Sequence, residues 1–347
     1  MQISNDTPFS TFAFNSLDSD DSPVGVVACR GTFDVLGNSL AVAHEQPAIV
    51  LADIYRDEPL TSSVRIDTDL VPRKLATDIT FNSVAYAPRN VAAAGWDVSV
   101  RVGRVSKNLR VTGPRSWKRG LLGWSLTAPE SVLSVPIQYE LAFGGTAEVA
   151  DETRPFEPNP VGLGFVPSAV RDLPASIPAP QIEAPDEPIT RFRQEYQPAG
   201  LGPIAKHWTP RRHLCGTADD AWKEERWPMR PVDFDFRYYN SAPEGLVYPG
   251  FLTGDEDVLL IGLSPDGPIE FRLPGIAMTI FGLKQNNDIL LDSMVLDTLH
   301  IDTEAMQISL TWRLTVPGHL DFSMIQLVPE RLSPEPHDAQ QRDQVYV

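Results

Sequence analysis

Proline is the feature of this sequence that most limits its fold. The chain has 32 prolines among 347 residues, about 9%, against a typical ~5%. A proline inside a helix costs ~3 kcal/mol, because it removes a backbone donor and clashes with the preceding turn. Long helices and coiled coils are therefore excluded. Twelve of the prolines lie in residues 151–210, which predicts an extended connection that runs over a surface.

Short runs of alternating apolar residues predict β-strands separated by turns. In residues 97–104, valines alternate with polar residues such as Arg101, which predicts a hairpin strand with an apolar inner face and a basic outer face. We expect its turn at residues 106–108. Further strands are expected at residues 24–35, 77–87, 258–263, 269–273, 276–281, 289–291, 294–301, 308–316 and 322–328.

The predicted fold class is mainly β, with antiparallel sheets in a sandwich or barrel-like arrangement, few short helices and long Pro-rich loops. One short helix is expected near residues 218–227, with Thr217 as its cap. The two β-rich halves of the chain either form separate units or one integrated domain. The predicted parts are an N-terminal β-rich part (1–150), a Pro-rich connecting segment (151–215), a C-terminal β-rich part (216–331) and a polar tail (332–347).

Charge is distributed unevenly along the chain. The formal net charge is −17, which argues against nucleic acid or an anionic membrane as the main partner. Residues 71–125 nevertheless hold 10 basic and 2 acidic residues, a local charge of +8. This basic island either pairs with acidic parts of the same chain or docks an acidic protein partner. The candidate partner-binding residues are Arg101, Arg104, Lys107, Arg110, Trp117, Lys118 and Arg119.

The two cysteines and the N-terminus indicate a compartment. Cys29 and Cys215 are far apart in the sequence and have no CxxC spacing, which fits a reducing cytoplasm. The sequence does not exclude a single disulfide between them. The first twenty residues have no cationic region followed by an apolar run, so we expect no signal peptide. No window approaches 18 apolar residues. We expect a soluble bacterial protein in the cytoplasm.

Residues with catalytic or metal-binding chemistry form no strong motif. His207, His213 and Cys215 are the best metal candidates, but their spacing matches no common zinc pattern. Ordinary imidazoles are the favoured interpretation, and a metal-dependent hydrolase built on these three residues is the alternative. No nucleophile elbow or phosphate-binding glycine loop is present. We expect no cofactor.

Several longer strings point to one family. Over about residues 24–312 the chain contains them in a fixed order: TDITFNSVAYAP, DVSVRVGRVSKNLRVTGPRSW, YELAFGGT, PNPVGLGF, GLGPIAKHWTPRRHLCGTADDAWKEERWP, FDFRYYNSAPEG and LDTLHIDTEAMQISLTWR. This ordered set resembles the bacterial domain-of-unknown-function 2169 family, whose members are associated with type VI secretion as effector adaptors or chaperones. The sequence departs from common members at Asn82, Ser83 and Ala85, where a Gly or His is usual.

The resemblance implies a cytoplasmic loading factor that stays behind when the secretion system fires. Its implied partners are a secreted effector toxin and the spike or spike-tip protein, and it implies no catalytic residues. The hypothesis is therefore a non-enzymatic adaptor that needs a rigid surface with an edge strand or groove for its client. A carbohydrate-binding β module, suggested by the aromatic residues, is a further alternative to the hydrolase.

Overall fold

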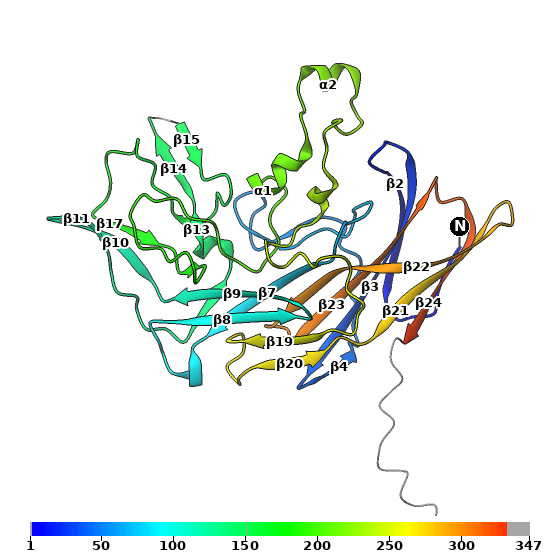
Figure 1. The fold of residues 1–347 in the computed structure, drawn as a ribbon, viewed down its shortest axis with the longest axis horizontal. Helices are drawn as coiled ribbons and strands as arrows, with labels where there is room; N and C mark the ends of the chain where they lie inside the picture. Colours follow the sequence, from blue (N-terminus) through cyan, green and yellow to red (C-terminus); the bar gives the residue numbers. More distant parts are fainter. Residues whose placement is uncertain (1, 151, 332–347) are drawn as a thin grey trace, which may run out of the picture.

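The computed structural model describes residues 2–150 and 152–331, and the predicted polar tail (332–347) lies outside them. Within the described residues the protein is mainly β, as predicted, and its helical segments are short (Figure 1). None of these helices is long and apolar enough to cross a membrane. The helical segments are α1 (Thr209–Arg212), α2 (Asp220–Glu225), η1 (Pro88–Asn90), η2 (Tyr139–Leu141), η3 (His213–Cys215) and η4 (Phe236–Tyr239).

The largest sheet combines strands from both ends of the chain. Its main path has the order β1-β24-β21-β22-β23-β3-β2, and β4, β7 and β12 pair beside that path. β3 and β23 are antiparallel neighbours over eleven residue pairs, although about 280 residues separate them. The strands are β1 (Gln2–Asn5), β2 (Ser10–Leu17), β3 (Pro23–Leu36), β4 (Ser39–Val42), β7 (Asp78–Tyr86), β12 (Ser134–Ile137), β21 (Ile276–Lys284), β22 (Ile289–Asp302), β23 (Gln307–Pro317) and β24 (Phe322–Arg331).

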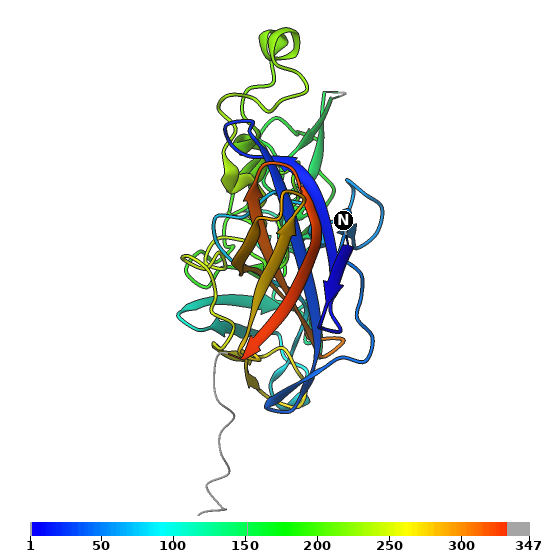
Figure 2. The ribbon, with the colours of Figure 1, turned by 90° about the vertical axis from the view of Figure 1, so that its right-hand side faces the viewer.

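This sheet curls into a half-barrel (Figure 2). Its edge strands β1 and β2 lie at opposite ends of the path, yet they follow one another in sequence. The Asn5 side chain closes the gap between them at one end, where Nδ2 donates to the Phe9 carbonyl at 2.6 Å and to Thr11 Oγ1 at 2.9 Å. The two edge strands are therefore linked at this end of the sheet through one side chain.

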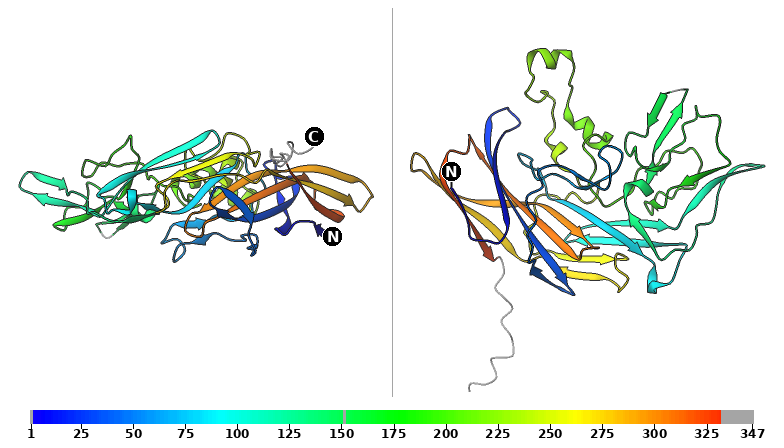
Figure 3. Two further views of the ribbon diagram at one scale, coloured as in Figure 1. Left: turned by 90° about the horizontal axis from the view of Figure 1, so that it is seen from below. Right: turned by 180° about the vertical axis from the view of Figure 1, so that it is seen from behind.

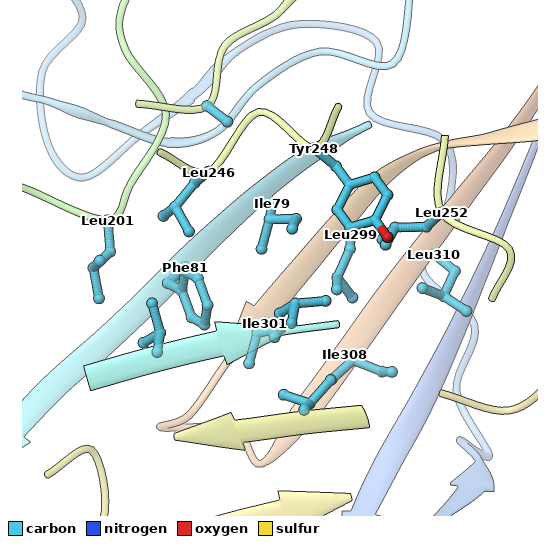
Figure 4. Packing of buried hydrophobic residues seen from close by; sticks show 14 of the residues in the cluster. Ile79, Phe81, Leu201, Leu246, Tyr248, Leu252, Leu299, Ile301, Ile308 and Leu310 are labelled. Atoms are coloured by element: carbon cyan, nitrogen blue, oxygen red, sulfur yellow. The ribbon is translucent and has the colours of Figure 1, made fainter. Parts of the chain in front are cut away.

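A second sheet packs on the first and completes the main core (Figure 4). The valines at 98, 100 and 102 are all buried, as the alternation predicted. The expected turn at residues 106–108 is wrong: Val102 pairs with Val105, so the turn is Gly103-Arg104, where Gly103 adopts a φ of 53°. The sheet has the order β18 (Ile182–Glu183), β9 (Val105–Thr112), β8 (Gly95–Val102), β19 (Asp257–Ile261) and β20 (Ile269–Arg272).

A smaller lobe at the other end of the elongated molecule has its own core (Figure 3). Much of the proline-rich region lies here, where Phe156 and Tyr196 pack on Phe143 in the same cluster as Trp117. This region thus buries aromatic side chains besides connecting the two halves. The short strands of the lobe are β10 (Arg115–Gly120), β11 (Gly123–Leu126), β13 (Phe143–Gly144), β14 (Thr146–Val149), β15 (Glu152–Pro155), β16 (Leu163–Gly164) and β17 (Ser176–Ala179), and β5 (Ile54–Tyr55) pairs with β6 (Val64–Ile66) elsewhere.

The helix expected near 218–227 is shorter than predicted and has a different cap. α2 spans Asp220–Glu225, and Asp219 caps it by accepting a hydrogen bond from the Trp222 amide at 2.8 Å. Thr217 instead donates from Oγ1 to Asp233 at 2.8 Å. α2 sits on an arm that projects from the body (Figure 1).

Candidate functional site

A groove lies between the β8–β9 hairpin, the proline-rich region and residues 237–247. Its cavity volume is about 1000 Å³, which is at the upper end of the range for ligand pockets. Figure 1 shows β9 on the side of its sheet that faces the loops around α1. Apolar side chains line the groove together with a few charged ones, among them Lys107, Asp186 and Glu244.

Prolines recur along the groove wall. Five of its lining residues are prolines, namely Pro158, Pro185, Pro198, Pro210 and Pro243. A proline fixes φ and reduces the conformational freedom of the loop that contains it. Loops stiffened in this way hold a cavity open at a small entropic cost on binding. Four of these five prolines lie between residues 151 and 210, so the proline excess of that region has a structural consequence here.

The groove also exposes part of a strand edge. β9 pairs with β8 along its whole length, but on its other side β18 covers only Arg110 and Val111. Ser106 and Asn108 line the groove and are exposed. No other strand among the described residues pairs with β9 there. The groove therefore contains main-chain groups that can accept a further strand.

Lys107 and Arg104 tie the hairpin to the opposite wall. Lys107 Nζ donates to the Glu244 carbonyl at 2.6 Å, and burial lowers the pKa of Lys107 to about 8. The Arg104 guanidinium lies 4.8 Å from the centre of the Tyr248 ring and donates to the Pro249 carbonyl. These two cations of the basic island thus make contacts within the chain.

A buried carboxylate anchors the wall formed by residues 237–247. Asp78 accepts hydrogen bonds from the backbone amides of Ser241 at 2.8 Å and Ala242 at 3.2 Å, and from Asn240 Nδ2 at 3.0 Å. Its charge is balanced by Lys74, whose Nζ lies 2.8 Å from Asp78 Oδ2, and both side chains are buried. β7 of the large sheet therefore holds the wall through the Asp78 side chain, in addition to main-chain hydrogen bonds such as the one from the Ile79 amide to the Leu246 carbonyl at 3.0 Å.

Most of the sequence matches a known protein family. Residues 20–313 match the family described as "Uncharacterized protein conserved in bacteria (DUF2169)". The chain belongs to this family. Searches of curated proteins and of solved structures found no match.

The matched residues of this DUF2169 protein include every residue that lines the groove. Strands β1, β2 and β24, which close the curl of the large sheet, lie outside the match. The groove is thus part of the region that defines the family, while the curl is completed by residues beyond it.

The other basic-island residues of the DUF2169 protein do not gather at one surface. Arg101 is exposed on β8, and Arg110 Nη1 lies 3.0 Å from Asp97 Oδ1 on the outer face of the hairpin. Lys118 and Arg119 are exposed on β10, in the smaller lobe. The candidate set is therefore divided between the groove, the outer face of the hairpin and the lobe.

Trp117 was expected on a partner-binding surface, and the structure places it in the core of the smaller lobe. Its side chain is only 3% exposed, and its ring lies 5.6 Å from that of Phe192. Burial of a large aromatic ring stabilises the folded protein, because it removes a large apolar surface from water. The sequence could not distinguish a core tryptophan from an interface anchor.

The three metal candidates of the hydrolase alternative lie on or next to α1 and η3. No three His, Cys, Asp or Glu side chains are grouped to hold a metal ion in the described ranges 2–150 and 152–331. His207 packs edge-on to Trp208, with 6.2 Å between ring centres, and burial lowers its pKa. Cys29 is buried and Cys215 half-buried, and both are free thiols.

Sequence reasoning missed two kinds of site residue. Ser106 and Asn108 were assigned to a turn, and nothing in their side chains indicates an open strand edge. Asp78 was assigned to a strand without a role, although its spacing to Lys74 is the one signal that could have suggested a pair. Both roles depend on segments that are distant in sequence.

Proposed function

We propose that this DUF2169 protein is a non-enzymatic adaptor that binds a type VI secretion effector, or its spike-tip domain, in the bacterial cytoplasm and promotes its loading onto the spike. The observation that carries the proposal is the groove: a cavity of about 1000 Å³ with stiff proline-rich walls and an open strand edge. The match over residues 20–313 supports membership of the DUF2169 family, the family for which the adaptor role was expected.

The groove suits the task of an adaptor. A client must be held firmly enough to reach the spike and then released, without being changed chemically. Main-chain hydrogen bonds at a strand edge provide affinity with little demand on the client sequence, while neighbouring pockets provide selectivity. Walls that are already in place lower the ordering cost of binding.

Secretion by the producing bacterium tests this function. Deletion of the gene should abolish release of the effector encoded beside it, while the tube protein is still secreted. Expression of the wild-type chain should restore release of the effector. The chain itself should stay in the cell pellet. Undiminished effector release from the deletion strain would contradict the proposal.

A further inference from the structure

We infer that the client binds as an added β-strand along Ser106–Asn108 of β9, inside the groove. This inference rests on the proposed function for the identity of the client. The occupant is an extended peptide segment, because main-chain donors and acceptors in one line recognise main-chain partners.

The pairing register shows which groups of β9 are free. Val102 and Val105 flank the two-residue turn, so they form a hydrogen-bonded pair. Along an antiparallel pair such residues alternate with residues whose N–H and C=O point away. Ser106 and Asn108 therefore direct their backbone groups away from β8 and toward the groove. None of the described strands pairs with these groups.

The chain is diverted from this edge just where it would otherwise cover it. β18 pairs Glu183 with Arg110, so its next residues would continue along β9 toward Ser106. Instead residues 184–187 form a turn, in which the Glu187 amide donates to the Ala184 carbonyl at 3.1 Å. Pro185 lies in this turn and has no N–H to give to β9.

Glu183 is also fixed in place at the end of β18. Its Oε2 accepts hydrogen bonds from Arg115 Nη2 at 2.6 Å and from the Ile189 amide at 2.9 Å. These contacts hold both sides of the turn, so β18 cannot slide along to cover the free edge. The edge remains open for a strand in line with β18.

The surroundings of the edge define the chemistry of the segment. Leu109, Ala242 and Val247 line the groove together with Lys107. Alternate side chains of an added strand face the same side. We expect the client segment to place apolar side chains toward Leu109 and Val247, with an acidic one opposite the Lys107 ammonium.

A proline substitution distinguishes binding through the main chain of β9 from binding through its side chains. Asn108→Pro removes the amide that points into the groove but leaves pairing with β8 intact, and Asn108→Ala keeps the amide. The probe is a set of overlapping twelve-residue peptides that covers the effector encoded beside the gene, titrated into the full chain by fluorescence anisotropy. We expect one region of the effector to bind, at least tenfold more weakly to the proline variant and within twofold of wild type to the alanine variant.

Hydrogen exchange gives an independent measurement on the unchanged protein. The amides of Ser106 and Asn108 should exchange more slowly when the effector is bound, and those of Lys118 and Arg119 should be unaffected. This second measurement decides the matter if the proline variant fails to fold. Effector binding without protection of Ser106 and Asn108 would overturn the added strand and leave the adaptor function standing. Absence of any effector binding to the wild-type chain would instead refute the adaptor function.

Discussion

At the scale of single residues, His300 shows how burial governs the protonation state of a side chain. It lies on β22 opposite Thr80 of β7, and its Nδ1 is 3.0 Å from Thr80 Oγ1. Burial, helped by the Arg30 guanidinium and opposed by Asp302, lowers the pKa of His300 to about 3. The imidazole is therefore neutral in the folded protein at neutral pH.

This burial predicts a pH dependence of stability. The unfolded chain binds a proton at His300 near pH 6.5 and the folded chain only near pH 3, so acid favours the unfolded state between these values. The stabilisation is complete above about pH 6.5 and decreases below it, by up to about 1.4 kcal/mol per pH unit. We expect the free energy of unfolding, measured by urea titration at several pH values between 5 and 6.5, to depend less steeply on pH for His300→Asn than for wild type.

The exposed His44 provides the matched control for this measurement. For His44→Asn we expect the same pH dependence of the unfolding free energy as for wild type, because the His44 side chain is exposed to solvent in the folded protein. If the unfolding free energies of wild type and His300→Asn changed equally with pH, the assignment of a neutral buried His300 would be contradicted.

At the scale of elements, the groove wall depends on β7 through Asp78. Asp78→Asn keeps the shape of the side chain but leaves Lys74 buried without its closest counter-charge. Breaking a buried pair in this way costs about 3–5 kcal/mol. We expect a loss of that size in the free energy of unfolding from urea titration, and faster amide exchange at residues 240–242, whose contacts the carboxylate makes.

Asp97→Asn is the control for that variant. Its ion pair with Arg110 is at the surface, where the Asp97 side chain is 68% exposed. Surface pairs contribute about 0–1 kcal/mol. A similar loss for both variants would show that Asp78 does not anchor the wall.

The elements were predictable from sequence to the extent that local alternation defines them. The buried valines of β8 follow directly from their spacing, since side chains of a strand alternate between faces. The turn after β8 was misplaced because Ser106 and Asn108 have turn-like side chains while the tighter Gly103-Arg104 turn closes the hairpin. The short edge strands β1 and β2 were not predicted, and pairing with distant strands defines them.

At the scale of the whole molecule, the sequence predicted the class of the fold and left the site to tertiary structure. Proline excluded long helices, and the described part of the chain has none. The open edge of β9 depends on where β18 stops, about 70 residues further along the chain. Only the assembled fold brings Asn108, Pro185 and Val247 to one groove. Local patterns in the sequence do not show which distant segments come into contact.

Three residues of the basic island make contacts within the chain. Lys107 and Arg104 fasten the hairpin to the opposite wall, and Arg115 pairs with Glu183 inside the structure at 2.6 Å. The local positive charge thus helps to build the groove and to hold the turn that keeps its edge open. Of these three residues, Arg115 pairs with a carboxylate of the same chain, whereas Lys107 and Arg104 contact main-chain carbonyls.

The most direct test of the central claim is the mass of the complex with the effector encoded beside the gene. Size-exclusion chromatography with light scattering should show a stoichiometric complex of the full chain with that effector. An unrelated effector from the same bacterium should elute alone under the same conditions. Separate elution of the chain and its neighbouring effector at micromolar concentrations would contradict the account.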